Sequence, residues 1–235
     1  GGYAEYCKVF YKHVLPIPKG MNFIEAAAIP ENFFTVWYNL FERGQIKKSD
    51  TILIHGGSSG IGTAAIQLCK VHGCKVITTV GNKKKQLYCK KLGADLAIDY
   101  NKSNFLEVIT KYTKNKGVDI ILDMVGQKYF EKNILLLKDK GKLIMIAFLS
   151  GSITKADFTA IMTKRLTITG STLRPRTDQE KAKIAKNLHK SYWTAFTKKT
   201  IKPNIYKIFN LKDAFKAHKL MESSKHLGKI VLKTK

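Results

Sequence analysis

The chain lacks several features that would assign it to a well-defined class of protein. No apolar run approaches the ~20 residues that a membrane-spanning helix needs, so we expect no membrane segment. The four cysteines form no C-x-x-C pair and have no metal-ligand spacing, which argues against disulfides and a structural zinc. Such thiols are typical of a reducing compartment, and we predict a cytoplasmic protein.

Acidic residues are also scarce: 17 of them stand against 42 lysines and arginines, for a net charge of +25. Such a charge raises nucleic acid as a partner. However, only four of the basic residues are arginine, which binds bases and phosphates more specifically than lysine does. The lysines are spread from Lys8 to Lys235 and do not gather on one element. We therefore interpret them as a solvated surface, and weak contact with nucleic acid stays as the alternative.

The chain is organised around residues 51–70, TILIHGGSSGIGTAAIQLCK. An apolar, β-favouring segment ends abruptly at a glycine-rich turn, and a helical pattern follows it. A strand, a glycine turn and a helix in this order are typical of a site for a diphosphate, because the backbone approaches closely and the helix start favours an anion. Ser59 stands at the middle glycine position of G-x-G-x-x-G and Gly60 follows it, so the motif is not ideal.

Strand and helix patterns alternate regularly from residue 51 to residue 170. This alternation predicts a parallel sheet covered on both faces, and six strands after a glycine turn indicate the doubly wound dinucleotide-binding (Rossmann) fold of the α/β class. The expected strands are 51–55, 75–80, 95–98, 118–123, 142–148 and 166–170, and the expected helices are 60–72, 83–92, 103–115, 127–138 and 157–164.

The two ends of the chain do not extend this sheet. We predict a strand over Tyr3–Phe10, a short helix from Asn22 to Ala28 and a second helix from Phe33 to Arg43. Towards the C-terminus we expect helices over 179–198 and 211–223 and strands over 205–209 and 229–233. Residues 1–30 and 175–235 are then parts of one companion domain, and the nucleotide domain is 31–174. Because Gly1 would begin within a strand, we expect further sequence before it.

The end of the second strand indicates which nucleotide binds. NAD-binding proteins of this fold usually carry an acid there, which holds the ribose 2′-hydroxyl. Here no acid lies between Lys75 and Lys91, and the strand runs into Asn82 and three lysines, 83–85. A carboxylate would repel a 2′-phosphate and lysines attract one, so we predict NADPH as the cofactor.

Several segments resemble the medium-chain dehydrogenase/reductase superfamily, and within it the zinc-independent NADPH:quinone oxidoreductases of the p53-inducible type. They are GGYAEY, EAAAIPENFFTVWYNLF, LIHGGSSGIGTAAIQL, KKLGADLAIDY, VDIILDMVG and HLGKIVL. The resemblance implies hydride transfer from NADPH to a quinone-like small molecule, and a homodimer for the full-length protein. It also implies that both ends are remnants of a GroES-like catalytic domain, most of which would precede Gly1.

The resemblance further implies cofactor contacts for individual residues. The pyrophosphate would be held by Ser59, Gly60 and Ile61, and the 2′-phosphate and adenine ribose by Asn82, Lys85 and Tyr100. The adenosine side would be bordered by Val125 and Gly126. The nicotinamide end would be contacted by Phe148, Leu149, Asn32 and Thr35. Lys229 would reach the cofactor from the C-terminal segment.

No catalytic constellation is visible in the sequence. His55, His72, His189 and His218 have no evident partners, and we interpret each as a surface or cap residue. Zinc-binding relatives carry a cysteine ligand near Glu31, where this chain has neither cysteine nor histidine, so we expect no metal site. The cofactor would carry the chemistry while the fold aligns it with the acceptor.

Three alternatives stay open. GGSSGIG also occurs in short-chain reductases, which need Tyr-x-x-x-Lys on one helix face; Tyr112 and Lys116 have that spacing, but they come too early in the chain and lack a serine partner. An enoyl-thioester reductase of the medium-chain superfamily is a closer alternative. A non-catalytic protein that binds NADPH or RNA is the third, and only the charge supports it.

Overall fold

The computed structural model describes residues 2–234, which divide into two compact units. The first consists of the described residues of Gly1–Trp37, Ser58–Ala64 and Leu173–Lys235, and the second of Tyr38–Gly57 and Ala65–Thr172. The domain boundaries expected from the sequence stay a prediction. No helix within residues 2–234 combines the length and the apolar character needed to cross a membrane.

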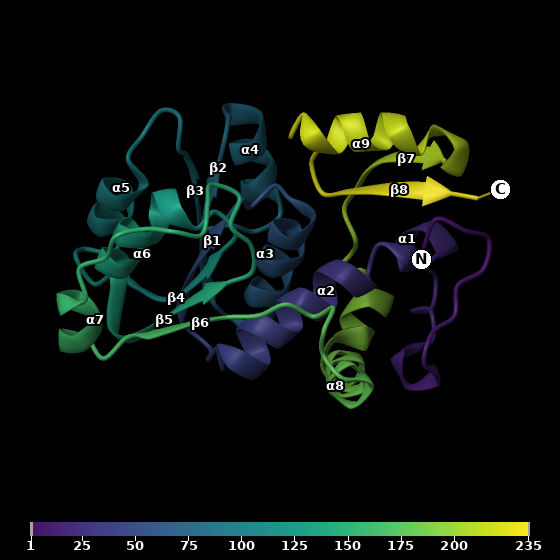
Figure 1. Cartoon of the computed structure of the whole chain (residues 1–235), viewed down its shortest axis with the longest axis horizontal. Helices are drawn as coiled ribbons and strands as arrows, with labels where there is room; N and C mark the ends of the chain where they lie inside the picture. The colour runs from purple at the N-terminus through teal and green to yellow at the C-terminus, as the bar shows by residue number, and fades with distance from the viewer. Residues whose placement is uncertain (1, 235) are drawn as a thin grey trace. The chain divides into compact units, whose positions relative to one another are not determined.

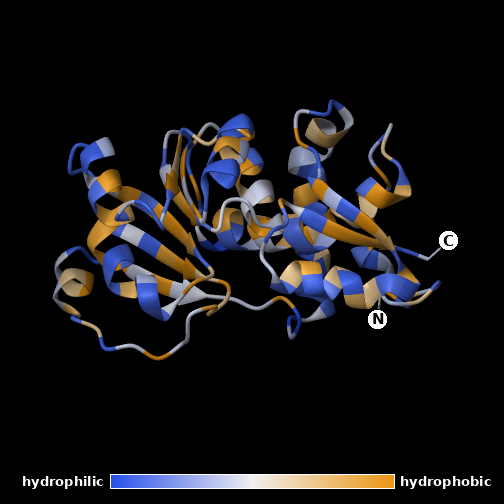
Figure 2. Ribbon diagram, turned by 90° about the horizontal axis from the view of Figure 1, so that it is seen from above, coloured by the Kyte–Doolittle hydropathy of each residue, from blue (hydrophilic) through white to orange (hydrophobic). Residues whose placement is uncertain are grey.

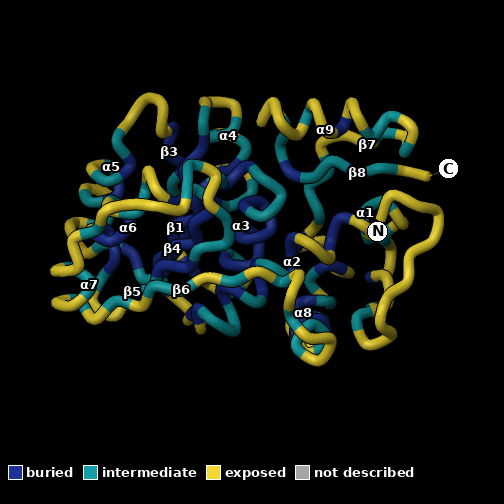
Figure 3. Tube along the Cα trace, viewed as in Figure 1, coloured by how far each residue is buried: buried dark blue, intermediate teal, exposed yellow. Residues whose placement is uncertain are grey.

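The second unit is built on a six-stranded sheet with the strand order β3-β2-β1-β4-β5-β6, and every neighbouring pair is parallel (Figure 1). All five residues of β1, the central strand, are buried (Figure 3). The predicted doubly wound parallel sheet is confirmed. Its strands are β1 (Thr51–His55), β2 (Lys75–Val80), β3 (Leu96–Asp99), β4 (Val118–Asp123), β5 (Leu137–Met145) and β6 (Thr167–Gly170).

Parallel strands need crossovers, so helices alternate with the strands. The helices are α3 (Gly60–His72), α4 (Lys83–Lys91), α5 (Phe105–Tyr112), η3 (Gln127–Tyr129), α6 (Phe130–Leu136) and α7 (Thr159–Thr163). Alternate strand residues such as Leu53, Ile77 and Ile121 pack with Phe105 and Ile109 of α5 in one fully or nearly fully buried cluster. Orange segments run along many of the strands in Figure 2, and the most apolar strands, β1, β2 and β4, are buried almost throughout.

The first unit contains four described α-helices and a parallel two-stranded sheet, β7 (Ile205–Asn210) and β8 (Lys229–Lys233). Capping boxes begin two of the helices. Asn22 caps α1 (Phe23–Ala27) with Glu25, and Thr177 caps α8 (Asp178–Thr197) with Glu180. Helix α9 (Ala214–Glu222) follows a single 3-10 turn, η4 (Leu211–Asp213), and the fourth helix begins at Pro30.

Pro30 begins the helix that follows α1. Since proline lacks an amide hydrogen, it is well suited to the first position of α2 (Pro30–Val36), which continues as a π-helical segment, η2 (Trp37–Arg43). The predicted start at Phe33 is therefore three residues late. Phe33 and Val36 are buried in this helix, and Phe33 packs edge-on against Phe196 of α8.

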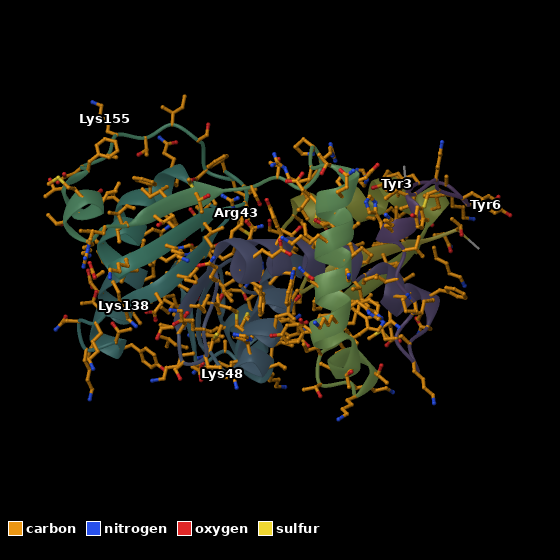
Figure 4. All side chains as sticks on the ribbon, turned by 90° about the horizontal axis from the view of Figure 1, so that it is seen from below. Tyr3, Tyr6, Arg43, Lys48, Lys138 and Lys155 are labelled. Carbon is orange, nitrogen blue, oxygen red and sulfur yellow. The ribbon has the colours of Figure 1, made fainter. Side chains whose placement is uncertain are left out.

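The strand predicted over Tyr3–Phe10 is wrong. These residues form bends and irregular backbone, followed by a 3-10 turn, η1 (Tyr11–His13). A strand needs a partner to satisfy its amides and carbonyls, and in the described structure β7 and β8 pair with each other alone. The segment is exposed throughout: Tyr6 exposes 89% of its surface and projects outward (Figure 4).

Candidate functional site

The turn after β1 is shaped by two glycines in the second unit. Gly56 has φ +71°, a conformation that side chains disfavour. A Cβ on Gly57 would stand 2.0 Å from Oγ1 of Thr78, whose hydroxyl donates to the carbonyl of Ile54 at 2.6 Å. The strand–turn–helix therefore requires glycine at 57 because β2 lies directly against it.

The next residues of the turn, in the first unit, open helix α3. The Ser59 hydroxyl accepts a hydrogen bond from the amide of Gly62 at 3.0 Å, and its carbonyl accepts from the amide of Thr63. The amide of Ile61 has no hydrogen-bond acceptor anywhere within residues 2–234. An unpaired amide at the positive end of a helix dipole is suited to a phosphate oxygen.

Asn32 lies against this turn. Its side chain is only 4% exposed, and Nδ2 and Oδ1 would be 2.8 and 3.0 Å from a Cβ on Gly60. Among residues 2–234 that side chain has no hydrogen-bond partner, which is costly for a buried amide unless a ligand supplies one. Thr35 lies one helical turn further on, where its hydroxyl donates to the carbonyl of Glu31 at 2.7 Å.

The C-terminal segment reaches the same turn. Gly228 donates its amide hydrogen to the carbonyl of Ser58 at 2.8 Å, and it forms a parallel bridge with Ser59. Lys229 follows, with Cδ 3.0 Å from the position of a Gly60 Cβ, and its ammonium forms an ion pair with Glu31. The structure thus brings Asn32, Ser59, Gly60 and Lys229 together.

On the second unit, Asn82 and Lys85 stand at the start of α4. The Asn82 side chain caps this helix by accepting from the amide of Lys85 at 2.9 Å. Lys85 is partly buried, and the loss of solvent lowers the pKa of its ammonium, while the nearby Cys89 thiol opposes that shift. No acid lies between Lys75 and Lys91, so the segment that follows β2 itself carries only lysines as charged residues; the nearest strand, β3, places the largely buried Asp99 beside Val80.

Tyr100 lies beside this helix start, at the end of β3. Its hydroxyl oxygen would be 2.7 Å from a Cβ on Gly81, so the tyrosine crosses the end of β2 directly. About half of Tyr100 is exposed, and its ring meets Tyr129 edge-on at 6.4 Å. Burial raises the pKa of Tyr129 to about 12, and the neighbouring Tyr100 and Asp123 add to that shift.

Two loops at the ends of β4 and β5 are joined by hydrogen bonds. Leu149 donates its amide hydrogen to the carbonyl of Met124 at 3.1 Å, and Ser150 donates to that of Val125 at 2.8 Å. Gly126 has φ +83°, and a Cβ there would be 2.6 Å from the Gly151 carbonyl. The loops hold the predicted residues Val125, Gly126, Phe148 and Leu149 near one another, with Phe148 50% and Leu149 78% exposed.

His55 is the residue that sequence reasoning misjudged. It is fully buried at the end of β1, and Nδ1 and Nε2 lie 2.9 Å from Thr79 Oγ1 and 2.8 Å from Asn133 Oδ1. Since that amide oxygen accepts, Nε2 donates its hydrogen. Burial lowers the pKa of His55, although Asp123 and Asn133 oppose that shift. Its position within the apolar strand 51–55 could have indicated that the side chain is buried.

Asp123 supports the same region from the end of β4. Its carboxylate is fully buried and accepts hydrogen bonds from the amides of Val125 at 2.7 Å and Gly126 at 3.1 Å. The ring of His55 lies 4.8 Å from that of Tyr129 and 5.2 Å from that of Phe105. The end of β4 is therefore fixed to the following loop by two buried hydrogen bonds, and the ring of His55 packs among aromatic rings at the end of β1.

The short-chain reductase alternative loses its structural basis. Helix α5 ends at Tyr112, and Lys114 and Asn115 then adopt positive φ values before Lys116. Tyr112 and Lys116 therefore do not share a helix face. The spacing in the sequence is accidental.

The sheet order and the glycine turn define a doubly wound dinucleotide-binding fold. The sequence profile of the zinc-binding dehydrogenase family matches residues 60–189. The quinone oxidoreductase of Homo sapiens is 29% identical over 233 residues, which are 99% of this chain and 69% of that protein.

Solved structures of dehydrogenases and reductases have the same fold as this chain. An NAD-dependent alcohol dehydrogenase matches 100% of this chain and 66% of its own, with a TM-score of 0.87 and 29% identity. Escherichia coli quinone oxidoreductase complexed with NADPH matches 92% of this chain and 66% of its own, with a TM-score of 0.82 and 29% identity. The chain thus spans about two thirds of the length of these relatives.

The chain belongs to the zinc-binding dehydrogenase family, within the medium-chain dehydrogenase/reductase superfamily of oxidoreductases. The resemblance to quinone oxidoreductases is confirmed. The family's name implies a metal, but residues 2–234 contain no cluster of three histidine, cysteine, aspartate or glutamate side chains able to hold one. Glu31, which the resemblance led us to compare with a zinc ligand, is paired with Lys229. The described residues do not fit zinc.

Proposed function

We propose that this chain is the cofactor-binding part of an NADPH-dependent, zinc-independent oxidoreductase that delivers a hydride to a quinone or another activated carbonyl or alkene. The observation that carries the proposal is the glycine turn at α3. A Cβ at Gly60 would fill the space beside Asn32, and Asn32 is a buried amide without a partner in the described structure. Both features favour a ligand with a diphosphate at this turn.

The preference for NADPH rests on the end of β2. The NAD-dependent and the NADPH-bound relatives show that the fold accepts either cofactor. In this chain Lys83, Lys84 and Lys85 follow Asn82, and the segment at the end of β2 contains no carboxylate that could hold a 2′-hydroxyl. A 2′-phosphate would meet positive charge from Lys85 and lie beside the hydroxyl of Tyr100.

Bound NADPH would supply the hydride, so the chain's own residues have to bind, orient and exclude water. The amide of Ile61 and the ammonium of Lys229 would hold the diphosphate. Asn32 and Thr35 would face the nicotinamide end. The backbone of Phe148 and Leu149 would fix the orientation of the ring, because the hydrogen bonds to Met124 and Val125 hold that loop in place.

Binding and turnover are tested separately. Fluorescence titration of the chain with NADPH and NADH should give clearly tighter binding of NADPH. Turnover is then followed at 340 nm with 1,2-naphthoquinone and, in parallel, with a 2-enoyl thioester. Equal affinity for the two cofactors would refute the assignment of NADPH, and faster reduction of the thioester would favour the enoyl-reductase alternative. Sedimentation at several concentrations tests the expected homodimer.

A further inference from the structure

An ion pair of opposite charges occupies the candidate phosphate site. The side chain of Lys229 lies against Gly60 of the glycine turn, and its ammonium is bound to the carboxylate of Glu31. The two residues are 198 positions apart in the chain, and the pair is joined within one compact unit. Glu31 thus places negative charge where the proposed cofactor would place its own.

The two partners differ in their exposure to solvent. The Lys229 side chain is 22% exposed and that of Glu31 is 68% exposed. Lys229 is held from two sides, since its backbone amide donates to the carbonyl of Asn204 at 2.6 Å and its alkyl chain lies along Gly60. The lysine is therefore fixed at the turn, whereas the glutamate can turn into water.

Other groups at the turn are left for a ligand. The Ile61 amide and the buried Asn32 side chain have no hydrogen-bond partner within the described chain. Both belong to the first unit and lie at or beside the start of the 13-residue helix α3. The turn is thus complete as an anion site except that its cation is engaged by Glu31.

We propose that Glu31 is an internal competitor for the diphosphate, a carboxylate that occupies Lys229 when the site is empty and must release it when the dinucleotide binds. This inference rests on the proposed function, because it concerns the same site. The competition weakens cofactor binding and provides Lys229 with a partner when the cofactor leaves. Glu31 would accordingly regulate the affinity and residence time of the cofactor without touching the reacting atoms.

The test compares four forms of the chain in fluorescence titrations with NADPH. Glu31→Gln should bind about fivefold more tightly than the wild type and release NADPH more slowly, the size expected when one screened charge beside the site is removed. Lys229→Gln should bind about tenfold more weakly. Glu222→Gln, which removes the same charge from exposed α9, is the matched control and should not differ from the wild type.

Salt provides a readout that a purely structural role would not affect. Between about 50 mM and 500 mM NaCl the advantage of Glu31→Gln should shrink, because salt screens the charge that the variant has lost. If the wild type binds NADPH and Glu31→Gln binds it no more tightly, the inference is overturned and the proposed function stays intact. Absence of NADPH binding by the folded wild type would refute the proposed function itself.

Discussion

Replacing His55 by leucine should cost stability in a way that depends on pH. The substitution removes two hydrogen bonds, and Asn133, fully buried and already lacking a partner for Nδ2, would lose the partner of Oδ1 as well. A buried acceptor left unpaired costs about 1–3 kcal/mol, and the lost bond to Thr79 about 1 kcal/mol more. We therefore expect a loss of about 2–4 kcal/mol in the free energy of unfolding at pH 7.5.

The pH dependence follows from the lowered pKa of His55. Between the pKa of 6.5 in the unfolded chain and the lower value in the fold, the unfolded state binds a proton that the native state does not. The stability contributed by neutral His55 is thus fully present above 6.5 and is lost as the pH falls below it. At one pH unit below 6.5 the wild type should have lost up to about 1.4 kcal/mol through this residue.

Urea unfolding at pH 7.5 and pH 5.5 measures both effects. The wild type should lose up to about 1.4 kcal/mol of that advantage at pH 5.5, so that the difference from His55→Leu becomes smaller. Thr79→Val is the matched control, because it removes one hydrogen bond but keeps the imidazole and hence the pH dependence. A difference that is equal at both pH values, or larger at pH 5.5, would refute the assignment of a buried neutral histidine.

Three further substitutions test the candidate site. Lys85→Glu should remove the preference for NADPH by weakening NADPH binding about tenfold or more while NADH changes little; an unchanged ratio of the two dissociation constants contradicts this role. Gly60→Ala should weaken NADPH binding at least about tenfold, since its Cβ would be 2.8 Å from Asn32 Nδ2, and circular dichroism should still show a folded chain. Gly57→Ala should destabilise the second unit by about 3 kcal/mol or more, because its Cβ would overlap Thr78; a melting temperature equal to that of the wild type rules this out.

The sequence predicted the sheet well because the relevant signals are local. Each buried strand is a short apolar run bounded by glycine or polar residues, and helix α3 was predicted over 60–72, as observed. Glycine at 57 and 60 was legible as a turn. The side chains that these glycines accommodate could not be predicted, because Thr78 and Asn32 are distant in sequence and contact the glycines only in the folded chain.

The errors have a common physical cause. Tyr3–Phe10 has the composition of a strand, but a strand forms only when a second strand lies beside it to hydrogen-bond with it. In the described structure no strand lies beside this segment. His55 looked like a surface residue because its partners come from β2 and α6, far along the chain. Likewise, the Glu31–Lys229 pair joins residues that no periodicity relates.

The bridge between Ser59 and Gly228 has a consequence for biosynthesis. The N-terminal part of a nascent chain leaves the ribosome first, so the glycine turn emerges long before the segment around Gly228 that pairs with it. The second unit ends at Thr172 and can acquire its sheet during translation, whereas Lys229 reaches Gly60 only after the following 57 residues, 173–229, have also been made. A nascent chain stalled before residue 228 would therefore carry a folded sheet and an unfinished anion site.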